Sequence, residues 1–390
     1  GQIHTIKKYG PDHMANFSPI PAMSLLSFIS GHRYNNLLGG IYCSYYEWYH
    51  DLPHVSSSMF GDQTENCESS DWYLSTYWVV AGSNINMTRT ADAHFISEAK
   101  YRGSKIVVIS PNYSDVTKYA DTWVPLVPGS DGAYLMACIH VILKEFYVDK
   151  ETPYFIEYAK QYTNQPFLVI LDEDGDNYQM GRFLRATDVA EYADEENSDW
   201  KLIMTDGEGK LHLPTGSLGF RWEKEPSGNW NLQLKNAVTN EDFDPLLTLL
   251  GNEDQNAMVS FSDFTDTFSI DLGKSTGESN NSVEILREVP ARRIKTHDGK
   301  ELLVTTAFDL LIAQAGVSRG LGGDYPVDYD DPKPYTPAWQ EAQTGVSRDL
   351  AIQIGREFAE NAEKTKGKSM FITGPGIQHF YHGASLYYRN

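Results

Sequence analysis

The chain has 390 residues, of which 41% are hydrophobic and 13% aromatic, enough for two or three ordinary domains with sizeable cores. Its 53 acidic side chains outnumber its 32 basic ones, and the formal net charge is −21. Nucleic acids and anionic membrane surfaces attract basic faces, so this balance disfavours both partners. The sequence also lacks an apolar run of about 18 residues, which would predict a membrane span.

The first predicted elements are a helix and a short strand. Residues 20–38 carry apolar side chains at near-helical spacing, and Gly39-Gly40 ends the segment. "GIYCSYY" then predicts a short buried strand. The chain begins without Met and stops within a helix-like pattern, so we interpret it as an internal fragment.

The clearest unit is 77–135. "YWVVAGSN" predicts a buried strand, "TRTADAHFISEAKYRG" a helix and "KIVVIS" a second strand. A strand, a helix and a strand within about 30 residues make a crossover unit, which predicts a parallel sheet. A short strand in "DTWVPLV", a glycine turn and another helix follow.

The sequence pattern changes from about residue 150 to 335, where turn-forming and acidic runs separate short segments of alternating apolar and polar residues. We interpret this region as loops and small antiparallel pieces around helices. After it, Ser347 can cap a helix, and "KSMFITGPG" predicts a strand that ends in a glycine turn. The predicted class is therefore α/β, with doubly wound parallel sheets and loop-rich or small β insertions; a generic sheet of this class without a large ligand is the alternative.

Four polar or glycine-containing loops follow predicted strands, where parallel sheets bind ligands. They are Gly82-Ser83-Asn84, Pro111-Asn112-Tyr113, Gly129-Ser130-Asp131 and Gly374-Pro375-Gly376. Glycine permits close approach to a pyrophosphate, and amide or carboxylate side chains can read a ribose or a base. Each loop alone is ordinary turn chemistry, and GxGxxG is absent. Together the four loops favour one or more nucleotide-bearing cofactors.

The stretch "EWYHDLPHVSS", residues 47–57, raises a separate question about Asp51. An aspartate before a proline more often caps a turn, but a carboxylate is also a ligand for a hard cation. Zinc fits poorly because neither HExxH nor CxxC is present. Cys43 is a possible thiolate ligand, although a cysteine in an apolar strand is more often part of the core.

Several long motifs resemble the molybdopterin oxidoreductases of the dimethyl-sulfoxide-reductase type, in particular the catalytic α subunits of respiratory nitrate reductases and nitrite oxidoreductases. They are "TIKKYGPDHMANFSPIPAMS", "WYHDLPHVSSSMFGDQTE", "ESSDWY", "GSNINMTRTADAHF", "GSLGFRWE", "YTPAWQEAQTGVSR" and "REFAENAEKTKGKSM". The resemblance runs nearly from end to end.

The resemblance implies a molybdenum centre with two molybdopterin guanine dinucleotides. Asp51 would bind the metal, and Tyr49 and His50 would orient the Asp51 carboxylate and shape the substrate pocket. The pterin dithiolenes would supply the other four ligands. One dinucleotide tail would lie along Gly82, Ser83, Asn84 and Thr88, with Pro111, Asn112, Gly129, Ser130 and Asp131 near its guanosine. Gly374, Gly376, Gln378 and His379 would serve the second tail.

The resemblance also implies a domain scheme. Residues 1–44 and 335–390 would be parts of one α/β domain, and 45–334 a second, Rossmann-like domain inserted between them and carrying the metal-ligand and nucleotide loops. The family's 4Fe–4S segment and closing C-terminal domain would lie outside the chain.

The expected activity is transfer of an oxygen atom between nitrite and nitrate, with electrons passed to iron–sulfur clusters. The match in 49–80 favours nitrite oxidation, and nitrate reduction at the same site is the alternative. A metal-free electron-transfer scaffold and a nucleotide-linked dehydrogenase are alternatives of other classes. The resemblance further implies an iron–sulfur β subunit, a membrane or haem γ subunit, and a membrane-associated site on the periplasmic or, alternatively, the cytoplasmic face.

Overall fold

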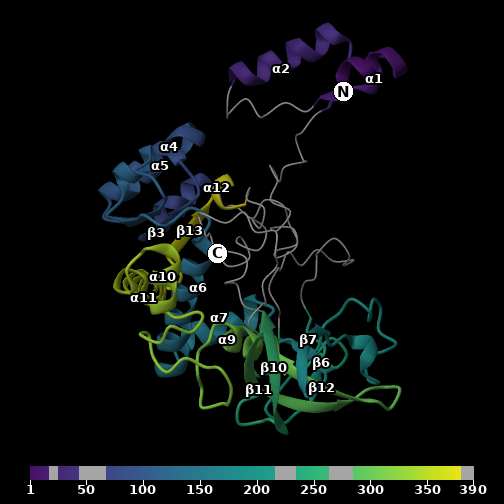
Figure 1. Cartoon of the computed structure of the whole chain (residues 1–390). Coiled ribbons are helices and arrows are strands. Elements are labelled where there is room, and N and C mark those ends of the chain that lie inside the picture. The colour runs from purple at the N-terminus through teal and green to yellow at the C-terminus, as the bar shows by residue number, and fades with distance from the viewer. Residues whose placement is uncertain (17–24, 44–66, 216–233, 263–283, 379–390) are drawn as a thin grey trace. The chain divides into compact units, whose positions relative to one another are not determined.

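The computed structural model describes residues 1–16, 25–43, 67–215, 234–262 and 284–378 (Figure 1). They fall into two compact units. One comprises Gly1–Asn66 with Gln378–Tyr388, and the other Cys67–Ile377 with Arg389–Asn390. None of the helices in the described ranges has the length and apolar character needed to cross a bilayer.

The first unit contains the helix and the short strand predicted near the N-terminus, but the strand is not buried as predicted, since Ile41 is 52% exposed. Its elements are α1 (Gln2–Tyr9), β1 (Ala15–Asn16), α2 (Leu25–Leu38) and β2 (Ile41–Tyr42). β1 and β2 pair in parallel. Gly39 follows α2 with a φ of 76°, a left-handed conformation that glycine adopts without steric cost.

A four-stranded parallel sheet organises the second unit and confirms the predicted α/β class. Its strands are β3 (Tyr77–Ala81), β4 (Lys105–Ile109), β5 (Thr122–Val124) and β13 (Ser369–Thr373). Their order is β13-β3-β4-β5, so the chain leaves β3 toward β4 and later returns on the other side of β3. The point where the order reverses lies between β3 and β13, and open α/β sheets bind ligands beside such a point.

Helices cover both faces of this sheet. On one face, Trp78 of β3 packs in a cluster with Ile96 of α5 (Ala93–Tyr101). Successive strand residues point to opposite faces, so Tyr77 points to the other one. There its ring lies 6.1 Å from that of Phe358 in α11 (Arg348–Thr365). α6 (Asp131–Ile142) and α10 (Pro337–Thr344) pack with α11.

The region 150–335 contains a closed five-stranded barrel, which the sequence prediction of small antiparallel pieces missed. Its strands are β6 (Leu168–Asp174), β7 (Asn177–Phe183), β10 (Gln255–Ser262), β11 (Glu284–Lys295) and β12 (Glu301–Thr306). Antiparallel pairs join β10-β11-β12-β6-β7, and a parallel bridge between Val259 and Tyr178 closes the barrel. Val259, Phe261 and Val289 are at most 1% exposed in its core.

The remaining α-helices and strands of the described residues lie outside these two sheets. They are α4 (Ile85–Thr88), α7 (Pro153–Tyr162), β8 (Met204–Thr205), β9 (Leu211–His212), α9 (Ala307–Gln314) and α12 (Pro375–Gln378). β8 and β9 form a small antiparallel hairpin.

The position of β13 bears on the predicted domain scheme with a boundary at residue 335, which stays a prediction. β13 pairs along its length with β3, from Ser369 opposite Tyr77 to Thr373 opposite Ala81, and α10 and α11 pack on α6. β13 therefore forms one sheet with β3, and α10 and α11 pack in the same unit.

Candidate functional site

The four predicted loops meet at one edge of the parallel sheet. All four strands run in the same direction, so the loops after β13, β3, β4 and β5 follow the carboxyl ends. This common edge was predicted from the sequence, and the strand pairing confirms it. Its ligand role remains a prediction.

The loops after β3 and β13 touch through glycines. The Gly376 N–H donates to the Gly82 carbonyl at 2.9 Å. A Cβ on Gly82 would lie 2.7 Å from the Ile377 nitrogen, and one on Gly374 would lie 2.6 Å from the Gly82 carbonyl oxygen. Glycine is thus required here by contact between two stretches of main chain. The sequence assigned these loops to two different dinucleotide tails, whereas they form one continuous part of the edge.

The loop after β3 continues into the short helix α4. Ser83 is 8% exposed, and the Asn84 side-chain oxygen accepts from the Val116 N–H at 3.0 Å. The Thr88 hydroxyl is exposed and donates to the Asn84 main-chain carbonyl at 3.0 Å. Asn84, predicted to read a ribose or a base, therefore already holds a neighbouring loop with its side-chain oxygen.

The loop after β4 presents Pro111 and Asn112 to solvent. Ser110 organises it: its hydroxyl donates to the Asn112 carbonyl at 2.9 Å, and its own carbonyl accepts from the indole of Trp123 at the same distance. The loop is therefore held at its base and exposed at its tip.

The loop after β5 leads into α6. Gly129 has a φ of 86°, and a Cβ there would meet no described atom within 4 Å, so only the turn demands glycine. Ser130 is buried, and its hydroxyl donates to the Val127 carbonyl at 2.6 Å. Burial raises the pKa of the Asp131 carboxyl, the first residue of α6.

The family of the chain follows from comparison with known proteins. A family model described as "Molybdopterin oxidoreductase" matches residues 2–389. The chain belongs to the molybdopterin oxidoreductase family.

Three similar members of this family carry nitrate reductase names. The "Respiratory nitrate reductase 1 alpha chain" of Escherichia coli K12 is 44% identical over 386 residues, 97% of this chain and 30% of that protein. The "Nitrate reductase alpha chain" of Bacillus subtilis 168 is 44% identical over 387 residues, with 99% and 30% covered. The "Nitrate reductase alpha subunit" of Mycobacterium tuberculosis CDC 1551 is 44% identical over 388 residues, again with 99% and 30% covered. The chain thus spans about 30% of the length of these relatives.

The molybdopterin cofactor that the family implies can be tested against the residues of the sheet edge. The 12-residue helix α6 begins there, and helix N-termini favour anions. The space beside Gly129 is open, and Asn112 is exposed for hydrogen bonding. These features fit an extended cofactor with anionic and hydrogen-bonding groups.

Several predicted site residues lie outside the described residues. These are Tyr49, His50, Asp51 and His379, and of Gln378 only the main chain is described, as the last residue of α12. In the described part of this molybdopterin oxidoreductase, no group of three or more His, Cys, Asp or Glu side chains could hold a metal.

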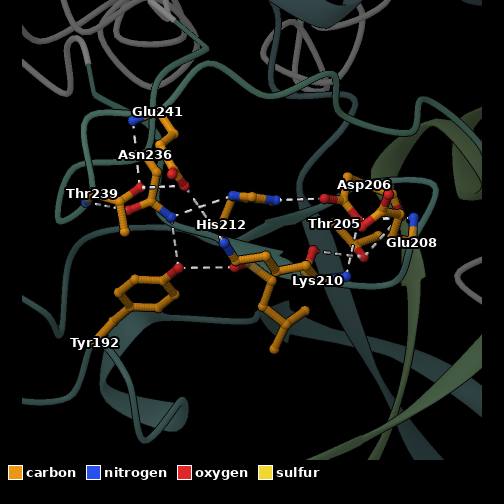
Figure 2. A network of polar contacts seen from close by, with 10 residues as sticks. Tyr192, Thr205, Asp206, Glu208, Lys210, His212, Asn236, Thr239 and Glu241 are labelled. Atoms are coloured by element: carbon orange, nitrogen blue, oxygen red, sulfur yellow. Dashed lines mark hydrogen bonds and ion pairs between the residues drawn. The ribbon is translucent and has the colours of Figure 1, made fainter.

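A polar network that the sequence analysis missed lies around the β8–β9 hairpin (Figure 2). His212 Nε2 lies 2.7 Å from Asp206 Oδ2, and His212 Nδ1 lies 3.3 Å from Asn236 Nδ2. The Asn236 amide also donates to the Tyr192 hydroxyl at 2.8 Å. Both ring nitrogens are engaged and the ring stacks on Phe243 at 4.2 Å, so this Asp–His pair is structural rather than a general base. The clue in the sequence is His212 in the alternating "LHL", six residues after the aspartate that opens the turn "DGEG".

Proposed function

We propose that the chain is the central part of the catalytic subunit of a molybdenum enzyme that transfers an oxygen atom between nitrate and nitrite. The observation that carries this proposal is the 44% identity to nitrate reductase α chains over 97% or more of the chain. The glycine-containing edge of the parallel sheet supports it, because a large cofactor needs such a surface.

Asp51 is the proposed protein ligand of the molybdenum. A carboxylate suits a hard, high-valent metal, and the proline two residues later in the sequence favours a turn. Tyr49 and His50 would orient that carboxylate and shape the substrate pocket. When bound, the metal would supply the two-electron oxygen-atom exchange that protein side chains alone cannot perform.

The carboxyl edge of the parallel sheet is the proposed binding site of a guanine dinucleotide. The N-terminus of α6 would face its phosphates, and Asn112 would lie beside the guanosine. The Asp131 carboxylate would accept a base N–H, and burial raises its pKa because the charged form is disfavoured there in the absence of such a donor. Gly374, Gly376, Gln378 and His379 are proposed for the second dinucleotide.

The direction of the reaction is the finer part of the proposal. Motif resemblance in 49–80 favours nitrite oxidation, whereas the names of the similar proteins favour nitrate reduction. Both directions use the same oxygen-atom exchange, so the protein's own residues do not decide between them.

An experiment on the intact complex tests both levels of the proposal. Molybdenum is measured per catalytic subunit, and turnover is compared with nitrite plus an oxidant and with nitrate plus a reduced viologen. Stoichiometric molybdenum with turnover in either assay is expected. Faster nitrate reduction would reverse the direction that the motifs favour, and a metal-free, inactive complex would favour the scaffold alternative.

The partners and location extend the same proposal. A 4Fe–4S cluster in the longer chain, an iron–sulfur β subunit and a membrane or haem γ subunit would carry the electrons. The complex would be membrane-associated on the periplasmic face, with the cytoplasmic face as the alternative.

A further inference from the structure

Three hydrogen bonds tie the loops at the carboxyl edge, one between each pair of neighbouring strands. The Gly376 N–H donates to the Gly82 carbonyl at 2.9 Å, which joins the loops after β13 and β3. The Val116 N–H donates to the Asn84 side-chain oxygen at 3.0 Å, which joins the segments after β3 and β4. The Trp123 indole donates to the Ser110 carbonyl at 2.9 Å, which joins β4 and β5.

Asn84 forms the central tie. Its main-chain carbonyl accepts from the N–H groups of Met87 and Thr88, both at 2.9 Å, and so starts α4. Its side-chain oxygen accepts from Val116, in the 3₁₀ turn Asp115–Tyr119. Both oxygens of Asn84 are therefore engaged by the protein itself, and the orientation of its amide is defined.

The segments that contain Asn84 and Val116 pack on the same hydrophobic cluster. Ile85, next to Asn84, is fully buried and Val116 is 1% exposed, and both belong to the cluster that includes Trp78. This hydrophobic cluster brings the two segments together, but apolar contact is not directional. The hydrogen bond to Asn84 adds the direction and spacing that a ligand-accepting surface requires.

We propose that Asn84 is a positioning residue, whose side-chain oxygen sets the spacing of the β3 and β4 loops so that the edge has its shape before any cofactor binds. A preformed edge lowers the ordering cost of binding. The identity of the ligand as a guanine nucleotide rests on the proposed function. The hydrogen bond between Asn84 and Val116 does not depend on it.

Hydrogen exchange in cofactor-free, full-length protein tests the tie directly. Asn84→Ala removes the acceptor, whereas Asn84→Asp keeps a side-chain oxygen that can accept. Asn86→Ala is the matched control, because Asn86 lies in the same short helix and its side-chain oxygen has no hydrogen-bond partner among the described residues. The readout is the exchange rate of peptides that cover Val116.

Exchange at Val116 is expected to be about fivefold faster in Asn84→Ala, because one hydrogen bond contributes on the order of 1 kcal/mol. Asn84→Asp and Asn86→Ala should match the wild type. Unchanged exchange in Asn84→Ala, or equally fast exchange in Asn84→Asp, would overturn the positioning role.

Binding of GMP to the same cofactor-free proteins separates this proposal from the proposed function. Weaker GMP binding by Asn84→Ala together with faster Val116 exchange supports positioning. Weaker binding with unchanged exchange would mean that Asn84 contacts the nucleotide, which overturns it. If wild-type protein does not bind GMP while the exchange pattern is as expected, the proposed nucleotide binding is wrong and the positioning role of Asn84 is supported.

Discussion

His212 and Asp206 form a buried pair across the β8–β9 hairpin, with Nε2 and Oδ2 2.7 Å apart and side chains 6% and 18% exposed. A carboxylate only accepts, so the Nε2 proton points to Asp206, and Nδ1 is left to accept from Asn236. Asn236 in turn accepts from the Val238 N–H at 2.9 Å. The histidine thereby joins the hairpin to the segment around Asn236 (Figure 2).

Replacing His212 by Ala should destabilise the β8–β9 hairpin and the described segment around Asn236. It leaves the Asp206 carboxylate and the buried Asn236 amide each without one partner, at a cost of about 2–4 kcal/mol. Hydrogen exchange of peptides covering 202–215 and 234–246 should rise while exchange of β3 and β4 stays the same. The matched control is His297→Ala, since the His297 side chain is exposed. If both variants behaved alike, the network would have no structural role.

A second prediction concerns acid stability and the ion pair between Glu145 and Arg356. Arg356 Nε and Nη2 donate to the Glu145 carboxylate at 2.8 and 2.6 Å, and these hydrogen bonds hold its pKa below the usual range. A depressed carboxyl pKa contributes stability above the unfolded pKa, and this contribution is lost as pH falls through the folded pKa.

Glu145→Gln should therefore destabilise the protein at pH 7 by about 1 kcal/mol, a modest value because Arg356 is partly exposed. The difference from wild type should shrink below about pH 4. Thermal unfolding of both proteins across pH 3–7 measures it. Glu363→Gln, which removes an exposed carboxylate from the same helix as Arg356, controls for lost negative charge. A difference that does not change with pH would contradict the assignment.

Sequence periodicity predicted the parallel sheet but missed the barrel, and the residues of β11 show why. Val289 and Ala291 are buried as an alternating strand requires, but Pro290 lies between them, and proline disfavours a strand assignment. Arg287 is also on the buried side, fully enclosed, where it donates to main-chain carbonyls including those of Ala313 and Pro334. A buried arginine satisfied by distant carbonyls cannot be recognised before the fold is known.

At the candidate site, the sequence predicted which loops meet but not what their residues do. Strand direction alone places the four loops at one edge. The contact between Gly82 and Gly376 joins positions almost 300 residues apart, and Asn84 meets Val116 only after both strands have paired. Local sequence does not contain such distant contacts. It therefore predicts a ligand-facing side chain at Asn84 and gives no sign of the hydrogen bond with Val116.

A third prediction separates two glycines that share a left-handed backbone. Gly82→Ala and Gly129→Ala both place a side chain at positive φ, which costs about 1–2 kcal/mol. Only at Gly82 would the new Cβ also lie 2.7 Å from the Ile377 nitrogen, whereas at Gly129 it would meet no described atom within 4 Å. Gly82→Ala should therefore lower the unfolding temperature several degrees further than Gly129→Ala and increase hydrogen exchange at Gly376. Equal effects would mean that the loops can separate without cost.

The last prediction concerns Asp51, the proposed ligand. Asp51→Ala should lower molybdenum-dependent turnover about 100-fold or more, since loss of groups that merely support a ligand already costs 10–100-fold. Circular dichroism and hydrogen exchange of the second unit should match wild type, because the Asp51 side chain is proposed to serve the metal rather than the fold. Asp71→Ala, which removes an exposed carboxylate, is the control and should keep full turnover. Normal turnover in Asp51→Ala would remove the metal-ligand assignment and leave the aspartate as the turn residue that its proline-containing sequence also allows.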